Sequence, residues 1–81
     1  KDVKLYPNPV KDVLNFSGNF FNSDTDIKII NILGKVLLSK KLDMNSNNTR
    51  NFINISNLPK GFYLVHLNNK TRTVTEKILI K

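Results

Sequence analysis

The stretch Leu58-Pro59-Lys60-Gly61-Phe62-Tyr63-Leu64-Val65-His66-Leu67 decides the fold of this 81-residue chain. Its proline and glycine occupy the second and fourth places of a four-residue turn that starts at Leu58, which predicts a type I turn. After this turn the residues are almost all apolar, both at odd positions such as Tyr63 and at even positions such as Leu64. This composition predicts that residues 62–67 form a central strand that is at least partly buried on both faces.

Outside this stretch, apolar residues recur mostly at a spacing of two within short windows, which Gly, Pro, Asn or Asp clusters separate. Gly34 and Lys35 predict a two-residue hairpin connection, and Asn68-Asn69 predicts a tight turn with left-handed backbone. The expected strands cover residues 3–6, 12–16, 25–32, 36–42, 50–56, 62–67 and 71–81. This pattern predicts an all-β fold, an immunoglobulin-like β-sandwich of about seven antiparallel strands.

Two of the expected strands carry side chains of interest on both faces. Within residues 25–32, Ile30 and Ile32 face away from the other isoleucines, which predicts a strand covered on both sides, by a neighbouring loop or by the parent protein. The last expected strand has Val74, Ile78 and Ile80 on one face and Lys77, Leu79 and Lys81 on the other. We therefore expect residues 71–81 to contribute to the core and to present lysines to solvent.

Length and composition indicate one small domain, residues 1–81, that is held together by packing alone. The chain has no cysteine, so no disulfide can stabilise its modest core. Its longest apolar runs are far shorter than the ~20 residues that a membrane-spanning helix needs, so no membrane span is predicted. Because the chain begins at Lys1 rather than Met, we expect it to be a piece of a larger protein.

The chain is strongly basic, with a formal net charge of +7. A basic surface of this kind can attract nucleic acid, anionic lipid or acidic glycan. However, the lysines are scattered along the sequence, and Lys40-Lys41 is the one adjacent pair. Nucleic-acid binding usually requires a compact basic patch with stacking aromatic residues, so no nucleic-acid partner is predicted.

The sequence lacks the components of a catalytic or metal site. His66 is the one histidine and there is no cysteine, so zinc would find no second soft ligand. His66 also lies among aliphatic residues, which favours a structural role. Asp24 and Asp26 resemble the start of a calcium loop, but the later ligands are missing. The sequence therefore predicts no catalytic residue, metal or cofactor, and it predicts that the domain is not an enzyme.

Three fragments in order resemble the C-terminal sorting domain of proteins exported by the type IX secretion system of Gram-negative bacteria. The residues Tyr6-Pro7-Asn8-Pro9-Val10 resemble the opening of that family, and residues 27–31 with Gly34-Lys35 resemble its middle strand and turn. Residues 58–64 are similar to its Leu-x-x-Gly-x-Tyr motif. One departure is Ile30, where the family commonly has an aromatic residue. The resemblance implies that the recognition or sorting motifs consist of Tyr6, Pro7, Asn8, Pro9, Val10, Gly34, Leu58, Gly61, Tyr63, Lys77 and Lys81.

The resemblance implies a C-terminal address for an N-terminal passenger domain. Such a passenger crosses the inner membrane by a signal peptide, and components of the type IX translocon then recognise its last domain. A sortase-like peptidase commonly removes that domain during export to the outer-membrane surface or the extracellular space, which implies a cleavable linker near or before Lys1. We expect the last strand and its lysines to form the recognised surface, with Lys81 as the C-terminus. The resemblance leaves the oligomeric state open.

Two other functions are compatible with a small β-sandwich. An accessory module could bind polysaccharide or protein beside a catalytic domain, and exposed aromatic side chains at Phe20, Phe21 and Tyr6 would then form its platform. A structural spacer or adhesion repeat would predict tandem copies of the domain, and the chain contains no internal repeat.

Overall fold

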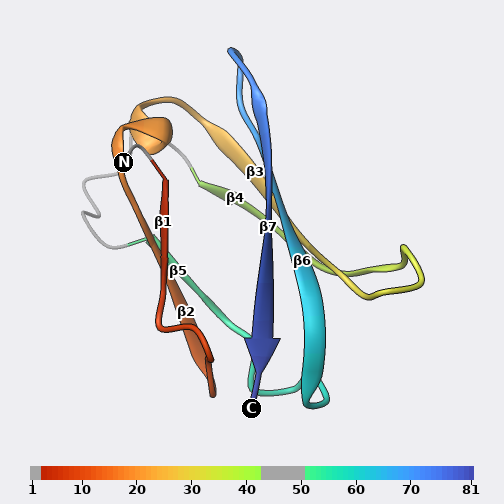
Figure 1. Ribbon diagram of the computed structural model, residues 1–81. Helices are drawn as coiled ribbons and strands as arrows, with labels where there is room; N and C mark the ends of the chain where they lie inside the picture. The colour runs from red at the N-terminus through yellow and green to blue at the C-terminus, as the bar shows by residue number, and fades with distance from the viewer. Residues whose placement is uncertain (1–2, 43–50) are drawn as a thin grey trace.

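The computed structural model describes residues 3–42 and 51–81, which form two antiparallel sheets packed face to face (Figure 1). The first sheet has the order β1-β2-β5 and contains β1 (Lys4–Tyr6), β2 (Val13–Ser17) and β5 (Asn51–Asn54). The second has the order β4-β3-β6-β7 and contains β3 (Thr25–Ile30), β4 (Val36–Leu42), β6 (Gly61–Asn68) and β7 (Thr73–Ile80). A 3-10 helix, η1 (Asn19–Asn22), connects β2 to β3. The prediction of an all-β sandwich of about seven antiparallel strands is confirmed.

The fourth strand gives this sandwich its particular topology. In immunoglobulin constant domains the fourth strand joins the sheet of the first, second and fifth strands. Here β4 pairs with β3 instead, in the sheet that also contains β6 and β7. A short hairpin connection between β3 and β4 explains this placement, because it favours antiparallel pairing of sequence neighbours.

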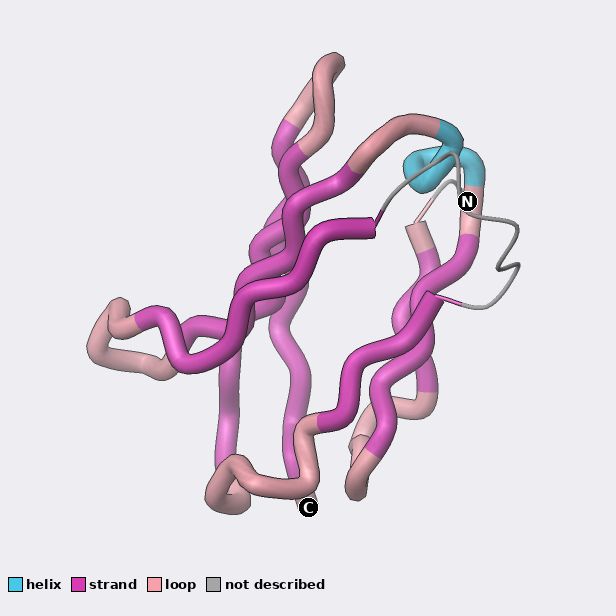
Figure 2. The backbone as a smooth tube through the Cα atoms, turned by 180° about the vertical axis from the view of Figure 1, so that it is seen from behind, coloured by secondary structure: helices cyan, strands magenta, loops and turns pink. Residues whose placement is uncertain are grey.

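The core lies between the two sheets, whose backbones face each other in Figure 2, and it is built from apolar side chains of both. Among the described residues, the fully buried apolar side chains come from both sheets and from the connections: Val10, Leu14, Ile27, Ile29, Ile55, Val65, Leu67 and Ile78. Thr25 is the one buried residue of the described chain that is polar. Its hydroxyl donates to the Ser23 carbonyl at 2.9 Å. The expected core face of β7 is thus confirmed at Ile78 and Ile80.

The β3–β4 connection is longer than the predicted two-residue turn. β3 ends at Ile30, and the Asn31 carboxamide oxygen accepts hydrogen bonds from the backbone N–H groups of Leu33 and Lys35, each at 2.9 Å. This side chain replaces strand pairing with local bonds, so the strand stops before Ile32. Ile32 is 79% exposed, so no described part of the chain covers the second face of this strand at that residue; cover by the parent protein stays a prediction.

The turn before β6 begins earlier than predicted. The Leu58 N–H donates to the Ile55 carbonyl at 3.0 Å, so the turn spans residues 55–58 rather than 58–61. The Asn54 side chain explains the shift, because its oxygen accepts hydrogen bonds from the N–H and the hydroxyl of Ser56 at 2.9 and 2.7 Å. Gly61 then starts β6 with a φ of +144°, which L side chains rarely adopt.

The β6–β7 hairpin is also held by an asparagine side chain. The prediction of left-handed backbone at residues 68–69 is wrong, since no described residue other than glycine has a positive φ. Instead, the Asn69 carboxamide oxygen accepts from the N–H groups of Thr71 and Arg72 at 2.9 and 3.0 Å. The Asn69 amide donates to the Phe20 carbonyl at 2.9 Å, which ties this hairpin to η1.

Candidate functional site

The N-terminal motif lies against the edge of the last strand. Val10 forms a parallel bridge with Ile80: its N–H donates to the Leu79 carbonyl, and its carbonyl accepts from the Lys81 N–H, both at 2.8 Å. The Val10 side chain is completely buried. Two of the motifs singled out in the sequence, one near each end of the chain, are therefore joined by backbone hydrogen bonds.

Asn8 extends this contact with its side chain. Its carboxamide oxygen accepts from the Leu79 N–H at 3.1 Å, and its amide lies 3.5 Å from the Lys77 carbonyl. The carboxamide thus takes the place of a neighbouring strand along the edge of β7. Pro7 and Pro9 flank it, are themselves exposed, and both follow cis peptide bonds. Because both prolines are exposed, they contribute little to the core.

Tyr6 occupies the exposed end of the same motif. Its side chain is 42% exposed, and the Lys4 ammonium lies 5.6 Å from the centre of its ring. Its carbonyl accepts a hydrogen bond from the Asn15 side chain at 3.2 Å. Tyr6 is thus available to a partner, while its backbone is fixed by β2.

The motif at residues 58–63 fixes the start of β6 beside the end of β7. Gly61 pairs opposite Ile80 in the register of the two strands. Tyr63 is buried, and its hydroxyl donates to the Pro59 carbonyl at 2.5 Å. Leu58 is half-buried against the core. A tyrosine that closes on backbone a few residues upstream is a recurrent device in sandwiches of this type, and here it holds the loop against the strand that follows it.

The two lysines of the C-terminal stretch are both exposed. The Lys77 ammonium lies 4.6 Å from the centre of the Phe62 ring, across the outer face of the second sheet. Lys81 follows the end of β7, and its backbone is held by Val10. Gly34 lies apart from these residues in the β3–β4 hairpin, where its φ is +89°. That hairpin projects from the body of the sandwich in both views (Figures 1 and 2).

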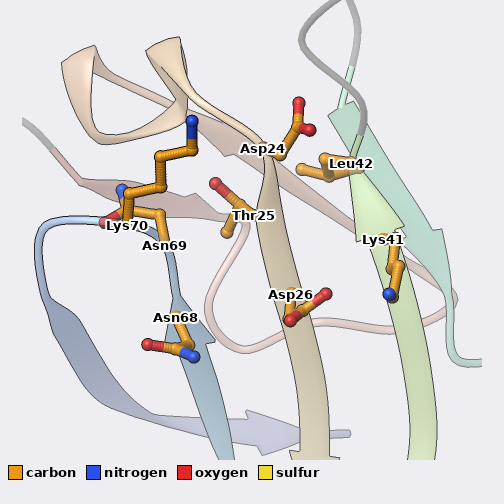
Figure 3. Close-up of a pocket in the computed structure, with 8 residues that line it drawn as sticks. All are labelled: Asp24, Thr25, Asp26, Lys41, Leu42, Asn68, Asn69 and Lys70. Carbon is orange, nitrogen blue, oxygen red and sulfur yellow. The ribbon is translucent and has the colours of Figure 1, made fainter.

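A depression with a volume of about 470 Å³ lies at another place in the fold (Figure 3). It is open and is lined by Asp24, Thr25, Asp26, Lys41, Leu42, Asn68, Asn69 and Lys70. The two aspartates that resembled a calcium loop do not converge there, and two lysines accompany them. Residues 3–42 and 51–81 contain no group of three or more side chains suited to a metal ion.

His66 lies on the outer face of β6, half-buried, with Nδ1 at 3.2 Å from the Thr75 hydroxyl oxygen. The structural role that its sequence neighbours suggested stays a prediction.

Two of the aromatic side chains that a polysaccharide-binding module would need are in the core. Phe20 is 4% exposed, and Phe21 is half-buried with its ring centre 5.3 Å from that of Phe20. These rings pack η1 onto the sandwich, so the predicted platform is not formed. The exposed aromatic residues that sequence reasoning missed are Phe52 and Phe62, at 40% and 52%. The alternation of side chains along β5 and β6 places both residues on outward positions, and this was the sequence signal that could have identified them.

The described residues form a small β-sandwich in which the two motifs near its ends meet at the edge of β7. The chain matches the family model of the secretion system C-terminal sorting domain over residues 4–81, and it belongs to this family, the sorting domains of type IX secretion. No curated protein matches the chain. Within the described residues, no helix is long and apolar enough to cross a membrane.

Membership of this family has consequences for the whole protein. A sorting domain implies an N-terminal passenger and the type IX machinery, and it directs export to the cell surface or the extracellular space. The domains of this family are not catalytic. The resemblance found in the sequence is therefore confirmed at the level of the family.

Proposed function

We propose that this domain is a folded address, without enzymatic activity, that components of the type IX outer-membrane translocon bind directly. The observation that carries the proposal is the joining of the N-terminal turn to β7, through Asn8 and Val10. This contact fixes the end of β7, which carries Lys77 and leads to Lys81. A partner can bind such a preformed strand without first ordering it, which favours recognition of the folded domain.

The open part of the β7 edge supports a specific mode of binding. Leu79 and Lys81 direct their backbone groups away from β6, toward Val10. By the alternation of an antiparallel ladder, Thr73 and Thr75 direct theirs to the same edge. In the described residues, no strand pairs with β7 there before Val10. A partner strand can therefore add to residues 73–75 through main-chain hydrogen bonds, close to the exposed Lys77.

We also propose that a sortase-like peptidase removes the domain near or before Lys1. Val3 is 6% exposed and belongs to the core, so cleavage on its C-terminal side would remove a buried side chain. Cleavage before Val3 leaves all the described residues of the domain in place. Mass spectrometry of the fragment released during export should accordingly give a mass that includes Val3 and everything after it.

Export of a reporter tests the proposed function. A fluorescent protein with a signal peptide and residues 1–81 is expressed in a type IX-competent bacterium and in a mutant without the translocon. We expect surface or medium fluorescence only in the competent strain. Equal periplasmic retention in both strains, with the domain shown to be folded by protease resistance, would refute the proposal.

Matched variants then locate the recognised surface. Lys77→Ala with Lys81→Ala should reduce export, while Lys4→Ala with Lys11→Ala should leave it unchanged. Both pairs remove two exposed positive charges, so the net charge is the same. Deletion of residues 74–81 should abolish export, but it also removes Ile78 and Ile80 from the core, so the lysine pair is the more specific test. Equal export by the two lysine pairs would exclude the lysines from recognition.

A further inference from the structure

The outer face of the second sheet carries exposed apolar side chains that the fold does not use. We call Ile32, Leu33, Val36, Phe62 and Leu64 the outer apolar patch; their exposed fractions are 79, 88, 47, 52 and 37%. Among the described residues, the other large apolar side chains of comparable exposure are Tyr6 and Phe52, which lie in the other sheet. Exposed apolar side chains are thus concentrated in one region.

The strand registers make this region continuous. Val36 pairs opposite Ile30, Ile30 opposite Leu64, and Leu64 opposite Lys77, so these side chains form one row across the sheet. Phe62 occupies the next outward position on β6. A depression of about 250 Å³ joins Asn31 and Ile32 to residues 60–63, which connects the projecting hairpin to the sheet.

The patch is not explained by folding. The outer face of an antiparallel sheet is normally polar when water covers it. The neighbouring row follows this rule, since it consists of Ser39, Lys28, His66 and Thr75. At the hairpin, the bonds of the Asn31 side chain hold Ile32 and Leu33 in solvent rather than against the core. Contiguous exposed apolar surface of this kind marks an interaction site.

Charge around the patch selects the kind of partner. Exposed lysines surround it at Lys28, Lys35, Lys60 and Lys77. In the described strands, the outer face of the second sheet carries one acidic side chain, that of Asp26. It lies in the row beyond Lys28. A second copy of the chain would bring like charges together, which opposes association. A sugar would find one ring, that of Phe62, with Lys77 already over it.

We propose that the outer apolar patch docks onto a partner protein that has an apolar surface with an acidic rim. This inference rests on the proposed function, from which it follows that the partner belongs to the type IX translocon. Phe62 and Leu64 are the central contacts, because they come from a strand paired on both sides and are therefore rigidly placed. The lysines orient the encounter, and Ile32 and Leu33 extend the contact.

Binding to the purified, detergent-solubilised translocon tests the inference, with the wild-type domain as reference. Phe62→Thr with Leu64→Thr introduces β-branched residues, which suit a strand, and removes apolar surface. We expect this variant to bind at least about 30-fold more weakly, as for central residues of an interface. Phe52→Thr is the matched control, because Phe52 is also part-exposed with a lysine ammonium 4.9 Å from its ring centre. It should bind like the wild type.

Charge reversal tests the rim independently. Lys28→Glu with Lys35→Glu should weaken binding about tenfold at low salt and less at high salt, whereas Lys4→Glu with Lys11→Glu should not. Melting curves of all variants should coincide within a few degrees. Wild-type binding by the Phe62→Thr, Leu64→Thr domain would overturn the inference, as would self-association or glycan binding that depends on Phe62.

The reporter assay separates this inference from the proposed function. Translocon-dependent export of the wild-type reporter together with unimpaired export of the Phe62→Thr, Leu64→Thr reporter would leave the proposed function standing and refute the patch. Absence of translocon-dependent export by the wild-type reporter would refute both. Loss of export by this variant, with normal export by the Phe52→Thr reporter, is the result that the inference predicts.

Discussion

Replacement of Tyr63 by Phe removes one hydroxyl from the motif at residues 58–63 and leaves the buried ring in place. The hydroxyl donates to the Pro59 carbonyl at 2.5 Å, and the tyrosine is 6% exposed. Loss of a hydrogen bond that leaves a partly buried acceptor unpaired costs about 1–2 kcal/mol. For a domain of this size each kcal/mol lowers Tm by about 4–8 °C, so we expect Tm to fall by about 4–16 °C.

Thermal unfolding followed by circular dichroism measures this shift, and Tyr6→Phe is the matched control. Tyr6 loses the same atom from a ring that is 42% exposed, so its Tm should change by less than about 2 °C. Equal shifts for the two variants, or a change below about 2 °C for Tyr63→Phe, would refute the view that this hydroxyl closes the loop on β6. Urea unfolding should give an unchanged m-value, because the core is preserved.

Three further substitutions test the turns and the contact at β7. Gly34→Ala places an alanine at a φ of +89° in open space, so we expect a loss of about 1–2 kcal/mol from backbone strain alone in urea unfolding; no loss would mean that the turn relaxes. Asn69→Ala removes the tie to the Phe20 carbonyl, and hydrogen exchange should accelerate in the β6–β7 hairpin and not in β2. Val10→Ala truncates a fully buried side chain and should cost about 2 kcal/mol. A Val10→Ala domain as stable as the wild type would show that the Val10 side chain does not contribute to the core.

Strand positions could be predicted from the sequence because alternation of apolar residues reflects one buried face. This signal located β6 and the core face of β7, where Ile78 and Ile80 are buried. Turn boundaries were predicted less well. Gly and Pro marked the correct regions, but the side chains of Asn31 and Asn54 determine where the chain leaves the strand. Those bonds depend on a local geometry that residue type alone does not specify.

The outward positions were the least predictable part of the candidate site. Apolar residues on both faces of β6 indicated burial on both sides, yet Phe62 is 52% exposed. A sequence pattern cannot tell whether the second face of a strand is covered by the same chain or by a partner. Likewise, the sequence did not indicate that Phe20 and Phe21 in η1 are covered, and they were taken for exposed aromatic residues.

By itself the sequence determined the fold class, the family and the two motifs near its ends. The tertiary structure decided that Asn8 and Val10 meet Lys77, Leu79 and Lys81, and that β4 lies in the second sheet. The physical reason is that these associations use backbone groups and strand edges, which every residue possesses, so they leave no distinct pattern of side chains. Packing of the two sheets brings those edges together, and that packing depends on the whole chain.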